Sequence, residues 1–220
     1  MNLRIATYNV HNTDGSKSIV GIAQEIIKYK PDIIGLQEID VGVLRSQRKN
    51  TLGEINKLCG YPSAVFSKSI DYEGGEYGIG ALFKYPLVSM EKYMLPSLYE
   101  QRIIVKLVLD TESGYLSFFN THLSYVSRDA REEQLKFVKT ILSKEKRFIL
   151  TGDFNIESFD ELDILPSSKK ANCKDKPYNT FKSGGCIDNV IVSENIKIKN
   201  VILSESEYSD HNMLICDIVV

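Results

Sequence analysis

Short apolar runs that end in polar residues recur along the whole chain, and they predict a fold dominated by β-strands. The expected strands cover residues 3–9, 33–37, 62–67, 77–84, 87–94, 102–109, 115–121, 147–152, 187–193, 197–203 and 213–219. Two of these runs, Ile33 to Leu36 and Phe148 to Leu150, are apolar without alternation, which indicates strands covered on both faces. The pattern therefore favours a layered α/β arrangement of two packed sheets with helices outside.

Helical periodicity is clear in two segments. The first runs from about Lys17 to Tyr29 with apolar residues on one side, and Pro31 closes it. The second follows Asp129, which is expected as its N-cap, and it keeps its charged residues on the outer face. A shorter helix is expected at residues 52–58. Each apolar stripe predicts a helix that packs against one face of a sheet.

Composition narrows the class of protein. A chain of 220 residues with 43% hydrophobic content can bury one large core, and no Pro/Gly/Ser-rich stretch divides it, so residues 1–220 are expected to form a single domain. The 27 basic and 29 acidic residues nearly balance, so the chain lacks the excess of positive charge that is typical of proteins that bind duplex phosphates. Nucleic acid is still a candidate substrate, although the charge balance does not favour it.

The start of the chain reads as a strand, and no apolar run approaches the ~20 residues that span a bilayer. We therefore expect a cytoplasmic protein without a membrane span, and no obligate protein partner is implied. The cysteines lie far apart without a Cys-x-x-Cys pair, which favours buried or idle thiols over zinc or redox sites.

Polar residues with chemical uses stand at the ends of apolar runs. Asn9, Glu38, His122 and Asp153 each lie at or just past the carboxyl end of a predicted strand. If these strands are neighbours, the side chains converge at one edge of the sheets. The sequence thus predicts a polar site there.

Each of these residues has a functional and an ordinary interpretation. Glu38 offers hard oxygen ligands to a divalent cation, and Asn9 an amide, but taken alone the first reads as a solvated strand end and the second as a turn former. Asp153 and Asn155 are expected to point the same way on an extended segment, as a base beside an amide donor, unless they form an ordinary turn. His122 is expected to donate to a phosphate oxygen, or else to be a satisfied histidine at a sheet edge.

The pair Asp210 and His211 precedes the last apolar strand, at its exposed mouth. A carboxylate bonded to His211 would fix its tautomer and raise its basicity. Adjacent residues point apart on an extended chain, so Asp188 is the better partner for His211, and Asp210 is left free to assist a metal.

These residues together resemble the endonuclease/exonuclease/phosphatase superfamily, which includes deoxyribonuclease I. The resemblance spans nearly the whole chain, and several short motifs in the right order make coincidence implausible. In order, the matching segments are Thr7-Tyr8-Asn9, Gln37-Glu38, Gly75 to Phe83 followed by Pro86, Arg102, Asn120 to Leu123, Gly152 to Asn155, Thr180-Phe181, Ile187-Asp188 and Ser209-Asp210-His211. One departure is that Cys186 and Asn189 flank Asp188 where many relatives have Arg and Tyr.

The resemblance implies a four-layer α/β/β/α sandwich with two stacked mixed sheets. It implies that Glu38 binds Mg²⁺, with Mn²⁺ as an alternative, and that Asn9 and Asp210 assist. It also implies that Asp153 with Asn155 positions or deprotonates water, and that His122 and His211, the latter oriented by Asp188, stabilise the phosphate. Whether Asp153 or His211 is the base stays open. The expected substrate-binding residues are Arg102, Arg45 and Tyr77.

Other residues near these motifs have weaker support. Glu76 matches a second carboxylate of the nuclease branch only loosely, and a glycine-rich hairpin explains its segment better. Arg45 also fits a solvated charged loop. His11, in turn-rich surroundings, is more readily a turn residue than a substrate contact.

Three functions remain at this stage. The first is a metal-dependent hydrolase of a small or exposed phosphoester, of the phosphodiesterase or phosphatase type. The second is a DNA or RNA nuclease of the same superfamily, which needs a basic groove that tracks several phosphates. The third is a binding module that has lost turnover, although every expected catalytic position is filled.

Overall fold

In the computed structural model of the protein, which describes residues 1–11 and 16–220, two six-stranded sheets stack face to face. Sheet A has the order β11-β12-β1-β2-β4-β3, and sheet B has the order β5-β6-β7-β8-β10-β9. Sheet A comprises β1 (Asn2–Asn9), β2 (Ile33–Val41), β3 (Ser63–Tyr72), β4 (Gly75–Phe83), β11 (Lys197–Ser204) and β12 (Met213–Val219). Sheet B comprises β5 (Leu87–Met94), β6 (Ile103–Thr111), β7 (Gly114–His122), β8 (Phe148–Asp153), β9 (Ser168–Lys170) and β10 (Asp188–Ser193).

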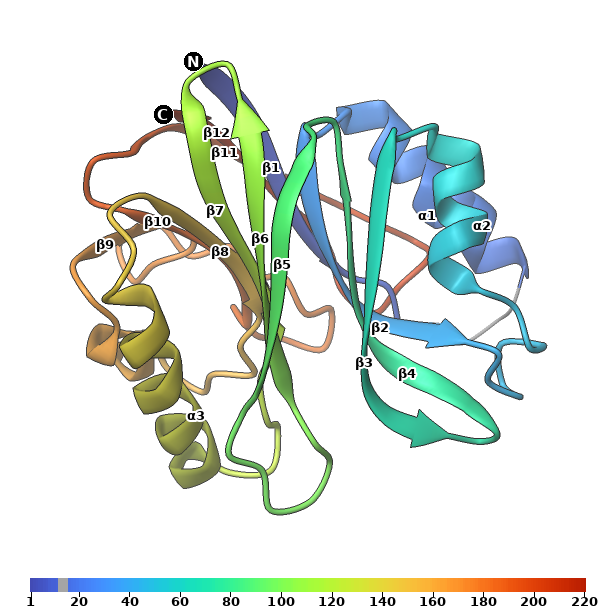
Figure 1. Cartoon of the computed structure of the whole chain (residues 1–220). Helices are drawn as coiled ribbons and strands as arrows, with labels where there is room; N and C mark the ends of the chain where they lie inside the picture. The colour runs from blue at the N-terminus through green and yellow to red at the C-terminus, as the bar shows by residue number, and fades with distance from the viewer. Residues whose placement is uncertain (12–15) are drawn as a thin grey trace.

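Helices cover the outer face of each sheet (Figure 1). The helices α1 (Ser16–Tyr29) and α2 (Thr51–Cys59) pack on sheet A, whereas α3 (Arg128–Leu142) and the short 3-10 helix η1 (Phe159–Ile164) pack on sheet B. The four-layer α/β/β/α sandwich expected from the sequence is therefore confirmed. Among the described residues, none of the helices combines the length and the apolar character that a membrane span needs.

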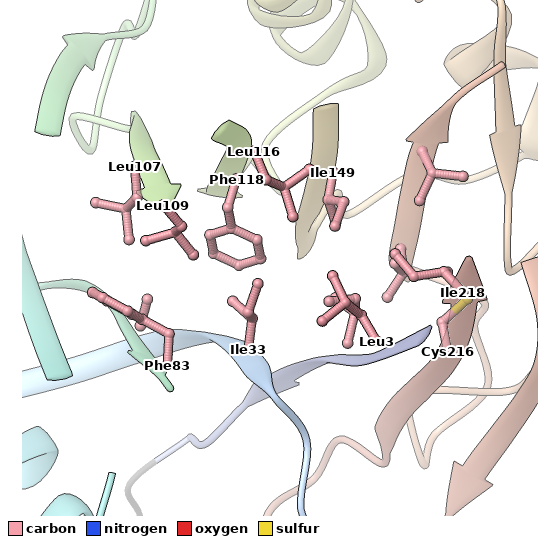
Figure 2. Packing of buried hydrophobic residues seen from close by; sticks show 14 of the residues in the cluster. Leu3, Ile33, Phe83, Leu107, Leu109, Leu116, Phe118, Ile149, Cys216 and Ile218 are labelled. Atoms are coloured by element: carbon pink, nitrogen blue, oxygen red, sulfur yellow. The ribbon is translucent and has the colours of Figure 1, made fainter. Parts of the chain in front are cut away.

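The main core fills the space between the two sheets. Figure 2 shows two rows of apolar side chains that face each other, one from each sheet. Sheet B supplies Leu107, Leu109, Leu116, Phe118 and Ile149, and sheet A supplies Leu3, Ile33, Phe83, Cys216 and Ile218. Every one of these residues is at most 2% exposed, so removing them from water is the dominant contribution that holds the sheets together.

Two helix boundaries test the sequence signals. Asn50 caps the start of helix α2, where its side chain accepts the Gly53 N–H at 2.9 Å, and Gly60 caps its end with φ of 72°, a left-handed conformation that glycine adopts without strain. The expected N-cap of α3, Asp129, is wrong. Ser127 caps this helix by accepting the Ala130 N–H at 3.2 Å, and Asp129 lies in the first turn, where its charge meets the positive end of the helix dipole.

The structure lengthens two expected strands and adds two short elements. Strand β2 continues to Val41 and β3 to Tyr72, because the two pair with β4 and form a longer ribbon than their apolar runs suggest. The three-residue strand β9 and the helix η1 were not expected, since neither is long enough to show a hydrophobic period.

Each sheet contains one parallel pair of strands joined by a helix. In sheet A, β1 and β2 are parallel and α1 connects them; in sheet B, β7 and β8 are parallel and α3 connects them. We call these pairs unit A (β1-α1-β2) and unit B (β7-α3-β8). The carboxyl ends of their strands lie at the same edge of the stacked sheets, and this geometry gathers the site residues.

Candidate functional site

Unit A and unit B meet through the side chain of Asn9, at the end of β1. Its Nδ2 donates to Glu38 Oε1 at 3.0 Å and to Asp153 Oδ2 at 3.0 Å, so one amide joins residues of both sheets. Its Oδ1 accepts the backbone N–H of His11 at 3.0 Å. Because His122 is in register with Asp153 on the neighbouring strand, the four residues that the sequence places at strand ends do come together.

Glu38 lies within strand β2 and not at its end, so that part of the sequence expectation is wrong. Gln37 and Glu38 together oppose the single residue Ile79 of β4, which is a β-bulge, and Glu38 has φ of 61°. Burial opposes ionisation of this carboxyl, but hydrogen bonds from His11 and Asn9 outweigh it and lower the pKa of Glu38 to about 2. The bulge therefore presents an ionised carboxylate.

Asp153 occupies the centre of the site and is 1% exposed. Its Oδ2 lies 3.4 Å from Nε2 of His122 and 3.7 Å from Nε2 of His211, and its Oδ1 accepts the backbone N–H of Asn155 at 3.0 Å. Burial and the nearby charge of Asp188 raise the pKa of Asp153 above its usual range. A carboxyl with a raised pKa is well placed to accept a proton near neutral pH.

The structure pairs His211 with Asp188, as the sequence suggests. Nδ1 of His211 lies 2.8 Å from Asp188 Oδ2, and the ring of Phe181 lies 5.0 Å from the imidazole, centroid to centroid. Burial opposes the positive charge, but the Asp188, Asp153 and Asp210 carboxylates outweigh it and raise the pKa of His211 to about 9. His211 is therefore a cationic hydrogen-bond donor at neutral pH.

His122 behaves in the opposite way. It is 5% exposed, and burial together with the positive charge of Arg102 lowers the pKa of its imidazole well below the usual value. The site thus holds a neutral imidazole and a cationic one, both near Oδ2 of Asp153.

Asn155 does not share the direction of Asp153. Strand β8 ends at Asp153, and Asn155 takes φ of 49°, so the segment is not extended as expected. Its side-chain Nδ2 donates to the carbonyl of Leu123 at 3.0 Å, which ties the loop after β8 to the loop after β7. Asparagine tolerates the left-handed region better than most residues, and this explains its place in the turn.

His11 is a member of the site that the sequence did not favour. Its Nδ1 lies 3.1 Å from Glu38 Oε2 and 3.9 Å from Asp210 Oδ2, and the bond to Glu38 raises the pKa of His11. Its spacing of two residues from Asn9 was the available signal. The contact itself depends on the bulge at Glu38, which the sequence does not reveal.

Two groups of side chains in the described part of the chain could hold a cation. Asp153, Asp188 and His211 bring ligand atoms within 4.8 Å of one another, but Asp188 and His211 already bond each other there. Glu38 and Asp210 offer carboxylate oxygens with side chains 16% and 42% exposed. Hard oxygen donors with access to water suit Mg²⁺, so the chemistry of the second group fits that ion better.

A buried polar network lies behind the site, between the two sheets. The Asn120 side chain, from β7, donates to the carbonyls of Leu36 and Gly80 in sheet A at 3.0 and 2.9 Å. Its Oδ1 accepts from Gln37 Nε2 at 2.7 Å and from Thr151 Oγ1 at 3.2 Å. Asn120 therefore fixes the β2 backbone next to the Glu38 bulge.

Glycine is required where this network approaches β2. A Cβ on Gly35 would lie 2.2 Å from Thr151 Oγ1 and 2.6 Å from Asn120 Oδ1, so no side chain fits at this position.

The expected substrate-binding residues lie beside the site but are already engaged. Arg45 makes two hydrogen bonds of 2.9 Å to the buried Asp40, and its guanidinium lies 5.3 Å from the ring centroid of Tyr77. Arg102, 4% exposed, lies 3.2 Å from Glu100. Glu76 lies in the β3-β4 hairpin, 3.6 Å from Lys68.

Comparisons with known structures agree with this architecture. An endonuclease/exonuclease/phosphatase from Beutenbergia cavernae is 18% identical with a TM-score of 0.78, over 100% of this chain and 72% of that one. A protein of the same family from Bacteroides thetaiotaomicron is 20% identical with a TM-score of 0.76, over 99% and 95%. Truncated TDP2 from Caenorhabditis elegans is 19% identical with a TM-score of 0.81, over 100% and 98%. At these identities the similarity is one of fold.

Sequence comparison adds the family. A search of curated proteins gives no match. The model of the endonuclease/exonuclease/phosphatase family, however, matches residues 6–211, which includes every strand-end residue of the site. This family consists largely of phosphoester hydrolases and generally depends on divalent metal ions. Because the match covers nearly the whole chain, the protein belongs to the endonuclease/exonuclease/phosphatase family.

Proposed function

We propose that the protein is a Mg²⁺-dependent phosphoester hydrolase in which water attacks phosphorus, with Mn²⁺ as a substitute ion. The observation that carries the proposal is the placement of two imidazoles near Asp153 Oδ2, beside the Glu38 and Asp210 carboxylates that suit a hard cation. Family membership supports the same reaction class.

Glu38 and Asp210 would hold the cation, and Asn9 would keep Glu38 in place through its amide. A divalent ion bound there supplies positive charge that stabilises the phosphate as negative charge develops on it. The low pKa of Glu38 supports this role, because the ligand is ionised without the ion.

Asp153 would act as the general base that takes a proton from the attacking water. Its raised pKa and the hydrogen bonds from Asn9 and the Asn155 backbone support this role, since they give a basic carboxylate in a fixed orientation. The raised pKa of His211 argues against that residue as the base at neutral pH, because it is already protonated.

His211 and His122 would donate hydrogen bonds to the non-bridging phosphate oxygens. Asp188 orients the ring of His211 and stabilises its positive charge, with Nε2 of the ring near Asp153. His122 donates as a neutral imidazole, also near Asp153. Both donors are preorganised in a buried site, where such bonds are strongest.

The ion pairs of the basic residues favour a small or exposed phosphoester over a long nucleic acid. A groove that tracks several phosphates needs free cations, whereas four arginines are bonded to carboxylates: Arg45 to Asp40, Arg102 to Glu100, Arg128 to Glu132 and Asp160, and Arg131 to Glu157 and Glu161. A nuclease of the same superfamily is therefore the second choice.

The test is a panel assay of the purified protein with Mg²⁺ or EDTA. The substrates are an aryl phosphodiester, an aryl phosphomonoester, single-stranded DNA, RNA, plasmid and sphingomyelin, and the control variant is His211→Ala. We expect Mg²⁺-dependent turnover of a small ester that the variant loses. Turnover of nucleic acids alone would select the nuclease, and silence of the folded protein on every substrate would favour a binding module.

A further inference from the structure

A small cavity of about 110 Å³ opens beside the proposed catalytic site. Its lining residues are Arg45, Ile70, Tyr72, Tyr77 and Glu100. Ile70 and Tyr77 pair across β3 and β4, so most of the wall belongs to sheet A, whereas Glu100 comes from the loop that precedes β6 of sheet B. The cavity therefore spans the same two sheets as the site.

Two links place this cavity next to the reacting groups. On one wall, Arg45 is bonded to Asp40, two residues after Glu38, and the charge of Glu38 contributes to raising the pKa of Arg45. On the other wall, Glu100 lies 3.2 Å from Arg102, whose charge acts on His122. A group attached to a phosphate between Glu38 and His122 would reach the cavity.

The wall formed by sheet A is held in a fixed geometry, with the rings of Tyr72 and Tyr77 tilted by 52° to each other. Arg45 is held by two hydrogen bonds to Asp40, whose side chain is fully buried. Its guanidinium carbon lies 5.0 Å from the ring centroid of Tyr72 and 5.3 Å from that of Tyr77. The two rings are 6.1 Å apart. The hydrogen bonds to Asp40 fix the edge of the Arg45 guanidinium, and the tyrosine rings fix its face. The wall is therefore preorganised.

The chemistry of the cavity excludes the phosphate itself. Glu100 brings a carboxylate that repels an anion, and Arg45 has two of its donors committed to Asp40. Tyrosine faces and a stacked guanidinium attract flat unsaturated rings. The volume is well below the ~300–1,000 Å³ of pockets for drug-sized ligands, and it is suited to a single ring.

We propose that this cavity binds a planar ring carried by the substrate's phosphoester, stacked on Tyr72 and Arg45. The inference rests on the proposed function, because the phosphate anchors the ring. Two sources share this chemistry: an aryl group and a nucleobase. Glu100 distinguishes them, since its carboxylate can accept an N–H of a nucleobase but gains nothing from a plain aryl ring.

The test uses phosphonates, which share one head group and cannot be hydrolysed at the carbon–phosphorus bond. Isothermal titration in Mg²⁺ compares phenylphosphonate, cyclohexylphosphonate and the 5′-phosphonate of thymidine. We expect phenylphosphonate to bind about ten-fold tighter than cyclohexylphosphonate, because the two rings are similar in size and differ in planarity. Tyr72→Ala should abolish this preference. Tyr115→Ala, at an exposed tyrosine that begins β7 at the end of the strand opposite His122, should keep it.

The second variant, Glu100→Leu, removes the acceptor oxygens and identifies the source of the ring. A selective loss of thymidine phosphonate affinity would indicate a nucleobase, and an equal effect on both rings would indicate an aryl group. Equal dissociation constants for phenyl- and cyclohexylphosphonate in the wild-type protein would overturn the proposal, and so would a preference that survives Tyr72→Ala. The binding measurement does not depend on turnover, so the two proposals can fail separately. A protein that hydrolyses phosphoesters but binds both rings equally would contradict only this inference. A protein that prefers the planar ring but hydrolyses no substrate would contradict only the proposed hydrolase.

Discussion

Unit A and unit B have the same architecture but offer different chemistry at the same edge of the sandwich. Each is a parallel strand pair joined by a helix (Figure 1). Each also places two polar residues where its strands approach the site. Unit A contributes Asn9 and Glu38, and unit B contributes His122 and Asp153. The shared geometry explains why four residues far apart in sequence meet.

The difference lies in the partners of the two carboxylates and in their access to water. The side chain of Glu38 in unit A is 16% exposed, whereas that of Asp153 in unit B is 2% exposed. Burial opposes ionisation of both groups, but hydrogen bonds from His11 and Asn9 lower the pKa of Glu38, whereas the nearby charge of Asp188 acts with burial and raises the pKa of Asp153. The comparison teaches that one carboxylate stays charged and can hold a cation, while the other can accept a proton. Two carboxylates of similar intrinsic acidity thus acquire separate roles from their surroundings.

The largest expected effect comes from a substitution of Asp153, the proposed general base of unit B. Asp153→Asn keeps the shape of the side chain but removes its basicity, so we expect kcat to fall by about 10²- to 10⁴-fold while the free energy of unfolding changes little. Steady-state kinetics and urea denaturation measure the two quantities. The matched control is Asp163→Asn, at an exposed residue paired with Lys170, which should keep wild-type activity. A fully active Asp153→Asn protein would remove this residue from the mechanism.

The next effect tests how firmly the units are joined. Asn120→Leu removes the hydrogen bonds that unit B makes to the carbonyls of Leu36 and Gly80, and it leaves those buried groups unpaired. We expect the free energy of unfolding to fall by about 3 kcal/mol in urea denaturation. Asn2→Leu, at an exposed residue of β1, should change it by less than about 0.5 kcal/mol. Equal stability of the two variants would mean that the apolar core alone joins the sheets.

The smallest effect concerns an ion pair that holds the chain beyond Asp153 to helix α3. Arg131 Nε donates to Glu161 Oε2 at 2.7 Å. Burial opposes the negative charge of Glu161, but the bond from Arg131 outweighs it and lowers the pKa of Glu161. The stabilisation is present above the ordinary pKa of 4.5 and is lost as the pH falls through the lower folded-state pKa. Between about pH 6 and pH 3, the wild type should therefore lose more unfolding free energy than Glu161→Gln.

The control for this pH series is Glu133→Gln, on the exposed face of α3, which should follow the wild-type curve. A Glu161→Gln protein that is more sensitive to acid than the wild type would show that the sign of the linkage is reversed.

Much of the fold follows from the sequence for simple reasons. Runs such as Ile33 to Leu36 are apolar on both faces because helices cover sheet A on one side and sheet B covers it on the other. The same runs end where water begins, so the polar residues that follow them mark the edge of the sandwich. The positions of Asn9, His122 and Asp153 could therefore be predicted from the sequence.

The predictions that were wrong concern residues whose conformation depends on partners distant in sequence. The bulge at Glu38 arises from the register between β2 and β4, and the contact of His11 with Glu38 follows from that bulge. Asn155 turns into the left-handed region because its side chain meets the carbonyl of Leu123 on another loop. Asp129 and Ser127 are both good caps by type, and only the position of the helix decides between them.

The central claim is that Glu38 of unit A and the neighbouring Asp210, and not the buried group of Asp153, Asp188 and His211, hold the cation. Isothermal titration of Mg²⁺ into two variants tests it directly without any turnover. We predict that Glu38→Gln weakens Mg²⁺ binding by at least about ten-fold, because one anionic oxygen ligand is lost, while Asp188→Asn leaves the dissociation constant within about three-fold. Intact Mg²⁺ binding in Glu38→Gln, together with a loss in Asp188→Asn, would contradict the account.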